Sequence, residues 1–172
     1  MAMQSAPRVR RAYFDCRFGQ LHVHNAAPPG GGFDELTTVI CLHGSGETGR
    51  VFQPVLQVLG SNRSVFAPDL PGAGESDPAP GIDPVVAGAE AVTDFISSMR
   101  IRSFDLVARA TGCDIAQRLA KEQDSGLRRV VLISDQLAAG QAQGLGARLA
   151  ATLSLGDAQS TALGRLVEAL RA

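Results

Sequence analysis

The sequence predicts an α/β fold in which a mostly parallel sheet with flanking helices follows an N-terminal antiparallel hairpin. Short runs rich in β-branched and apolar residues alternate along the chain with longer segments of helical periodicity, a pattern typical of parallel sheets. The first two of these runs are separated only by a tight Phe-Gly turn, which favours an antiparallel pair. We therefore expect a sheet that begins antiparallel and continues parallel.

The hairpin is predicted at residues 12–18 and 20–25, and Pro and Gly residues then mark a loop at 26–32. Four further strands read as nearly continuous apolar runs, at 37–42, 63–69, 104–108 and 128–134. Runs of this kind are typical of parallel strands that are buried on both faces.

Helices are predicted between these strands. Asp83 is a candidate N-cap with Pro84 at the first helical position, and apolar residues follow it at helical spacing. These residues are Val85, Ala89, Val92, Ile96 and Met99. A second apolar stripe, at Ile115, Leu119 and Ala120, indicates another helix.

The chain beyond Ser134 gives no strand candidate. It is first rich in Ala, Gly and Gln, and it then offers an amphipathic helix with Asp157 as its cap and an apolar stripe at Leu163, Leu166, Val167 and Leu170. We expect a single domain over residues 1–172, with a core at 11–134 and a helical tail at 135–172.

Composition favours a folded globule and limits its partners. Of the 172 residues 45% are hydrophobic and 19% are charged, and the net charge is -1, so no basic surface for nucleic acid or anionic lipid is expected. The cysteines Cys16, Cys41 and Cys113 show neither a paired nor a metal-binding spacing. No signal peptide or membrane segment is evident. We expect a cytoplasmic protein without metal or cofactor.

The segment from Gly44 to Gly49 has two interpretations. It reads as the G-x-G-x-x-G phosphate loop of a dinucleotide-binding domain, with Asp69 at the end of the next strand as the ribose-binding acid. The overlapping residues Leu42-His43-Gly44 read instead as the turn that supplies one arm of an oxyanion hole. The first interpretation would place Pro54 inside the fingerprint helix, where it removes a hydrogen bond. Dinucleotide binding therefore stays a minor alternative.

Four segments, in this order and spacing, resemble the α/β-hydrolase superfamily. They are LHGSGETG, SVFAPDLPGAGESD, FDLVARATGCDIAQRLA and LRRVVLIS, and the resemblance covers about residues 11–134. It implies an α/β-hydrolase-type sheet that normally continues with two more strands after LRRVVLIS. No candidates for them are present, so a truncated version of the fold is expected.

A strand at the edge of such a sheet leaves its backbone groups unpaired, which invites pairing with another chain. We therefore expect a homodimer through the edge strand, the C-terminal helices, or both. The residues of this strand are Val130, Val131, Leu132 and Ile133.

In the resembled family a serine nucleophile lies on a G-x-S-x-G elbow between a strand and a helix. That elbow aligns here to residues 108–112, and the nucleophile position is Ala110, which cannot attack a carbonyl. The three histidines, His22, His24 and His43, all precede Ala110. Asp135 is at most a vestigial acid. No triad is therefore expected, and the resemblance leaves an oxyanion-like pocket at His43, Gly44, Ser45 and Thr111.

These departures set the functional expectations. We expect a non-catalytic pseudoenzyme, either a binding or interaction module or a relic, whose pocket takes a small anionic or ester-like ligand. The alternative is a hydrolase of small ester-like substrates that uses non-standard or partner-supplied residues. Whether the chain is an enzyme is left open at this stage.

Five further residues have a simple structural interpretation, which for most of them competes with a functional one. His22 and His24 project to the same side of a strand, and we expect solvent-facing residues rather than metal ligands because no third ligand is evident. Cys113 is expected to be a buried structural thiol. Arg109 is expected to be a solvated residue at a helix start, with anion binding as the alternative. Asp77 is a candidate loop-capping carboxylate.

Overall fold

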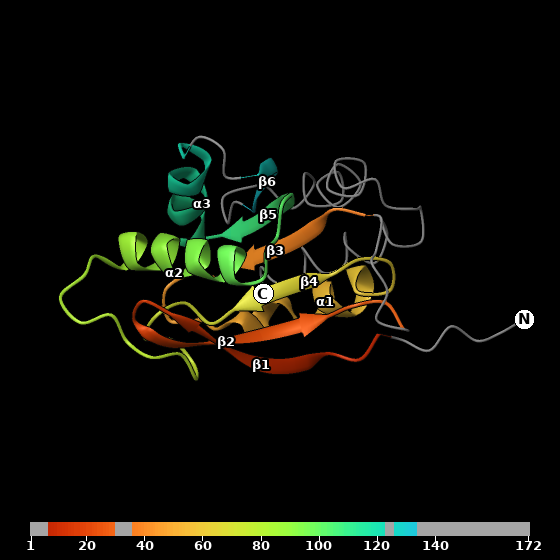
Figure 1. The fold of residues 1–172 in the computed structure, drawn as a ribbon, viewed down its shortest axis with the longest axis horizontal. Helices are drawn as coiled ribbons and strands as arrows, with labels where there is room; N and C mark the ends of the chain where they lie inside the picture. The colour runs from red at the N-terminus through yellow and green to blue at the C-terminus, as the bar shows by residue number, and fades with distance from the viewer. Residues whose placement is uncertain (1–6, 30–35, 123–125, 134–172) are drawn as a thin grey trace, which may run out of the picture.

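The computed structural model describes residues 7–29, 36–122 and 126–133, which form one six-stranded sheet with three flanking α-helices and one 3-10 turn (Figure 1). The order of the strands across the sheet is β1-β2-β4-β3-β5-β6. The strands are β1 (Arg10–Cys16), β2 (Gly19–Ala26), β3 (Thr38–Leu42), β4 (Val65–Pro68), β5 (Phe104–Arg109) and β6 (Leu127–Ile133). The helices are η1 (Gly49–Phe52, a 3-10 turn), α1 (Gln53–Leu59), α2 (Pro84–Ser98) and α3 (Gly112–Ala120).

The pairing confirms the predicted mixed sheet. β1 and β2 form an antiparallel hairpin, and β2 also pairs antiparallel with β4. The remaining pairs, β3 with β4, β3 with β5 and β5 with β6, are parallel. Each predicted strand is present, with its ends displaced by a few residues.

The two faces of the sheet bury separate apolar clusters, as the continuous apolar strands predicted. On β3, Val39 and Cys41 belong to the cluster that α1 covers, whereas Ile40 and Leu42 belong to the cluster that α2 and α3 cover. Figure 1 shows α2 and α3 on one side of the sheet and α1 on the other. Parallel strands in such a sandwich present their carboxyl ends to one edge, where ligands bind in open α/β sheets.

Local signals explain where the helices begin. The carboxylate of Asp83 accepts hydrogen bonds from the N–H groups of Val85 and Val86, which confirms the predicted cap of α2. Pro54 lies in the first turn of α1, where its missing N–H costs nothing. Met99 differs from the expectation, because it follows the end of α2 and its side chain is exposed.

Among the described residues β6 pairs only with β5 and so lies at the edge of the sheet. Val131 and Ile133 are buried, and the side chain of Leu132 between them is 39% exposed. The homodimer through Val130–Ile133 stays a prediction. The C-terminal helices and Asp135 lie outside the described residues. No helix in the described part of the chain is long and apolar enough to cross a membrane.

Candidate functional site

A sharp bend joins β5 to α3 at the position that the sequence aligned with a nucleophile elbow. Arg109 ends β5, α3 begins at Gly112, and Ala110 has a φ of 47°. This left-handed conformation costs a residue with a Cβ about 1–2 kcal/mol. The chain therefore keeps the strained backbone of an elbow, although alanine occupies its tip.

Close backbone contacts around the bend explain its small residues. A Cβ on Gly112 would lie 2.5 Å from the carbonyl oxygen of Leu42 at the end of β3. A Cβ on Gly44 would lie 2.7 Å from the Cβ of Ala110. Both distances are too short for real atoms, so glycine at these two positions lets the turn after β3 contact the elbow directly.

The structure brings together the predicted oxyanion residues, but one donor is already occupied. The N–H of Ser45 donates to Oγ1 of Thr111 at 2.7 Å, and the two hydroxyl oxygens are 3.1 Å apart. The resemblance to the α/β-hydrolase superfamily implied that this N–H would donate to an oxygen of the ligand. In the structure Oγ1 of Thr111 accepts that hydrogen bond instead.

His43 is buried and both of its ring nitrogens are hydrogen-bonded. The N–H of Leu70 donates to Nε2 at 2.9 Å, so the ring proton is assigned to Nδ1, which lies 2.8 Å from the carbonyl oxygen of Gly44. Burial lowers the pKa of His43, and the hydrogen bond to Gly44 and the nearby carboxylates of Asp69 and Glu47 oppose this effect without cancelling it. His43 is thus a neutral link between two turns.

An ion pair joins the elbow to the turn after β3. Oε2 of Glu47 accepts the N–H of Gly44 at 2.9 Å, and Oε1 lies 3.3 Å from Nη2 of Arg109. The expectation of a solvated Arg109 at a helix start is therefore wrong, because this residue ends β5 and its side chain is largely covered and paired with Glu47. Sequence reasoning missed Glu47, although its place three residues after Gly44 is a common spacing for a turn-capping side chain.

A cavity of about 430 Å³ opens beside these residues. Its polar lining residues are His43, Ser45, Asp83 and Thr111. The rest of the lining is mainly apolar and includes Leu70, Val85 and Ile115. The cavity therefore combines a mainly apolar wall with a few polar side chains, two of which carry hydroxyl groups.

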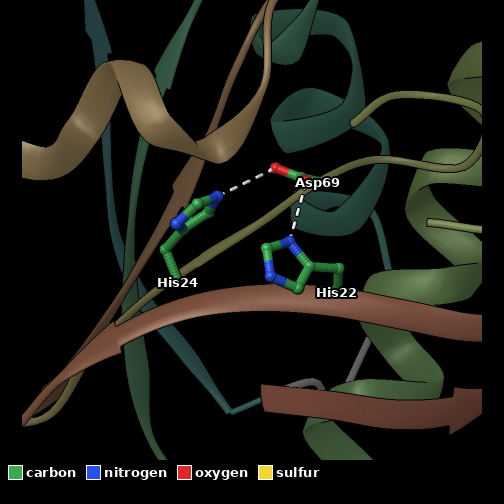
Figure 2. Close-up of side chains that lie close together, drawn as sticks. All are labelled: His22, His24 and Asp69. Atoms are coloured by element: carbon green, nitrogen blue, oxygen red, sulfur yellow. Dashed lines mark hydrogen bonds and ion pairs between the residues drawn. The ribbon is translucent and has the colours of Figure 1, made fainter. Parts of the chain in front are cut away.

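A second group of ionisable side chains lies where β4 ends beside β2. Nδ1 of His22 is 2.8 Å from Oδ2 of Asp69, and Nε2 of His24 is 3.4 Å from Oδ1 (Figure 2). The expectation that both histidines face solvent is wrong: the side chain of His22 is 3% exposed and that of His24 is 13% exposed. The register of β2 with β4, which the sequence does not reveal, covers this side of β2 and supplies Asp69 as their partner.

Asp69 is held by backbone groups as well as by the two rings. The N–H of Gly49 donates to Oδ1 at 2.7 Å and that of Glu75 to Oδ2 at 3.2 Å. Burial alone would raise the pKa of Asp69, but the hydrogen bonds from His24, His22, Glu75 and Gly49 hold the pKa well below its usual range. The carboxylate is ionised at neutral pH.

This arrangement does not favour the dinucleotide interpretation. Asp69 is buried and fully engaged, so it is not available to a ribose. The α-helix that follows β3, α1, begins at Gln53, beyond the motif of Gly44–Gly49, and only the 3-10 turn η1 starts at the last residue of the motif.

Two further sequence interpretations can be compared with the structure. Cys113 lies in α3 and packs against the core from a half-buried position. Asp77 accepts the N–H of Gln20 at 2.8 Å and so fastens its loop to β2.

Comparisons with known proteins agree with this architecture. Uncharacterized proteins of Mycobacterium bovis and Mycobacterium tuberculosis are each 28% identical to this chain over 96 residues, which is 56% of this chain and 28% of theirs. The epoxide hydrolase VrEH1 from Vigna radiata superimposes with a TM-score of 0.63 at 19% identity over 72% of this chain and 38% of its own. An epoxide hydrolase from an endophytic Streptomyces superimposes with a TM-score of 0.63 at 19% identity, over 72% of this chain and 36% of its own.

The chain thus spans less than half the length of these relatives and structural neighbours. At 19% identity the two epoxide hydrolases show the fold alone. The sequence model of the alpha/beta hydrolase family matches residues 39–171, which is most of the chain. The chain therefore belongs to the alpha/beta hydrolase family.

Proposed function

We propose that this chain binds a small molecule in the cavity beside the elbow and does not perform triad-type acyl transfer. The observation that carries the proposal is Ala110, which occupies the tip of the strained elbow where the family's nucleophile lies. A methyl group has no lone pair with which to attack a carbonyl.

Two hydrogen-bonding arrangements support the proposal. Both ring nitrogens of His43 are hydrogen-bonded, so this residue is not free to accept a proton. The N–H of Ser45 donates to Oγ1 of Thr111, so this donor is not free to stabilise an oxyanion.

The cavity indicates the ligand class. Its apolar wall at Leu70, Val85 and Ile115 suits a hydrocarbon body, and the hydroxyl groups of Ser45 and Thr111 suit one oxygen acceptor. We infer a small, mainly apolar molecule with a carboxylate or an ester carbonyl at one end.

Binding to this cavity can be tested with short-chain carboxylates and their methyl esters by NMR titration. We expect saturable shifts for residues of the cavity wall, and we expect Val85→Trp to abolish them by filling the cavity. Val58→Trp is the matched control, because Val58 is also a half-buried valine on a helix but packs in the cluster on the opposite face of the sheet. Saturable shifts that survive Val85→Trp unchanged would contradict the proposal.

One observation favours the alternative of an unconventional hydrolase. A Cβ added to Gly44 would lie 2.7 Å from the Cβ of Ala110 and 3.2 Å from Oε2 of Glu47. The carboxylate of Glu47 therefore lies beside the elbow. Such a group can in principle activate a water molecule. Its contacts with Arg109 and the N–H of Gly44 weigh against that role.

An activated acyl ester separates the two functions. We expect no turnover above the buffer rate. A rate that exceeds background and disappears in Glu47→Gln would replace the binding proposal with the hydrolase.

A further inference from the structure

The group of His22, His24 and Asp69 has the composition of a metal site, although no third ligand is evident from the sequence. The two histidines lie two residues apart on β2, so their side chains project from the same face. Asp69 directly follows β4, whose Pro68 and Ala67 pair with Val23 and His24 of β2. The sheet register thus brings three potential ligands from distant parts of the sequence to one point.

The distances among the ligand atoms fit a shared ion. One ring nitrogen of His22, one ring nitrogen of His24 and one carboxylate oxygen of Asp69 all lie within 4.8 Å of one another. Two ligands on a tetrahedral zinc ion, each about 2.0–2.1 Å from the metal, are about 3.3 Å apart. The separation is 2.8 Å from Nδ1 of His22 to Oδ2 of Asp69 and 3.4 Å from Nε2 of His24 to Oδ1, so each ring lies near that distance from one carboxylate oxygen (Figure 2).

The carboxylate is held in place before any ion arrives. The N–H groups of Gly49 and Glu75 fix its two oxygens, and a Cβ on Gly74 would lie 2.1 Å from Oδ2, so the loop after β4 closes tightly around it. Backbone donors that orient a ligating carboxylate are typical of the surroundings of metal ions.

The rings add orientation and a route of entry. The centroids of the His22 and His24 rings are 4.7 Å apart with an interplanar angle of 80°, and Tyr13 packs against His22 at 5.0 Å. His24 is the most exposed of the three side chains. An ion would therefore enter past His24, and water on that side would complete its coordination.

We propose that His22, His24 and Asp69 form a binding site for a zinc-like divalent transition metal ion. Two imidazoles and one carboxylate are a ligand set that zinc and ferrous iron both accept. On binding, each neutral ring presents a bare nitrogen to the ion and carries its proton on the other ring nitrogen. The ion then replaces the hydrogen bonds to Asp69.

The role of this site is structural and does not depend on the proposed cavity function. The three ligands join β2 to the end of β4, and Asp69 precedes Leu70, which lines the cavity and donates its N–H to His43. A bound ion would fasten the loop that forms one wall of the cavity.

The test is zinc titration of the full chain by calorimetry after treatment with a chelator. We expect one ion per chain, and we expect His24→Gln to weaken binding about tenfold or more. Glutamine can still donate a hydrogen bond to Asp69, so this variant should fold. Asp15→Asn is the control, because it removes an exposed carboxylate from β1 outside the group.

A wild-type chain that binds no zinc, or a His24→Gln variant that binds as tightly as wild type, would overturn the proposal. If His24→Gln does not fold, the histidine resonances of the wild-type chain still decide. Zinc should shift two of the three imidazole signals, those of His22 and His24, and leave that of the buried His43 in place. Equal shifts of all three would indicate non-specific binding and would also overturn it.

Discussion

The elbow at Ala110 and the group around Asp69 lie at the ends of two strands on either side of β3. The elbow has the backbone shape of an active site, and the group around Asp69 has the ionisable side chains. The elbow keeps the strained backbone and the close glycine contacts of its family, but its tip carries a methyl group. The group around Asp69 continues a regular sheet pairing, and there two imidazoles and a carboxylate meet.

The difference indicates that one set of residues determines the backbone shape of a site and another set supplies its reactive groups. Tight packing fixes the elbow, because Gly112 and Gly44 allow backbone segments to touch whatever residue occupies position 110. Side-chain hydrogen bonds fix the group around Asp69, whose carboxylate has four partners. Variants of each region should therefore fail in different ways.

Replacing Asp69 should have the largest effect. Asp69→Ala leaves the N–H groups of Gly49 and Glu75 and the rings of His22 and His24 without their acceptor. We expect the free energy of unfolding, measured by urea denaturation in a chelator, to fall by about 3–5 kcal/mol.

The control for this variant is Asp77→Ala, which removes a carboxylate from an exposed hydrogen bond to the N–H of Gln20. We expect a loss of about 1 kcal/mol there. Equal losses of unfolding free energy in the two variants would show that the buried hydrogen bonds of Asp69 stabilise the fold no more than an exposed one. The contrast between the two regions would then be wrong.

Gly112→Ala should have the next largest effect, and its sign is the reverse of the usual one. Alanine normally favours a helix over glycine by about 1 kcal/mol. Here the added Cβ would lie 2.5 Å from the carbonyl oxygen of Leu42, so we expect a net loss of about 1–3 kcal/mol in the free energy of unfolding. Gln117→Ala, at an exposed position of the same helix, should change stability by less than about 0.5 kcal/mol. A stabilised Gly112→Ala variant would refute the packing argument.

The pH dependence of stability should report His43, which joins the two regions. Burial lowers its pKa in the folded chain from the ordinary value of about 6.5, so below that pH the unfolded chain binds more protons than the folded chain. This contribution to stability is fully present above pH 6.5 and is lost as the pH falls toward the folded pKa. The slope for one group is at most about 1.4 kcal/mol per pH unit.

Urea denaturation between pH 8 and 5 measures this slope. His43→Gln, which loses the titrating ring, should show a smaller slope over this range than the wild-type chain. An unchanged slope would mean that His43 does not titrate differently in the folded and unfolded states.

The fold could be predicted from the sequence to a large extent because its signals are local. Continuous apolar runs identified the parallel strands, and Asp83-Pro84 identified the start of α2, where the carboxylate caps two N–H groups. The ordered motifs also predicted the bend at Ala110, which has a φ of 47°. Each of these signals lies within a few residues of the feature that it specifies.

The site was less predictable because its contacts join distant segments. His22 and Asp69 are 47 residues apart, and only the register of β2 with β4 brings them together. Without that register the histidines read as solvent-facing. The pairing of Glu47 with Arg109 and the occupied N–H of Ser45 likewise depend on how two turns meet.

Substitutions of Ala110 should have the smallest effect and separate backbone shape from chemistry most directly. Ala110→Gly relieves the left-handed strain of about 1–2 kcal/mol, but glycine adds entropy to the unfolded chain. We therefore expect a gain of no more than about 1 kcal/mol in the free energy of unfolding. Ala110→Ser restores a hydroxyl at the tip of the elbow without a base to activate it, so turnover of an activated ester should stay at the buffer rate. Saturable hydrolysis of the ester by the serine variant would mean that a general base lies within reach of position 110. The elbow would then not be chemically inert, and its contrast with the ionisable group at Asp69 would be wrong.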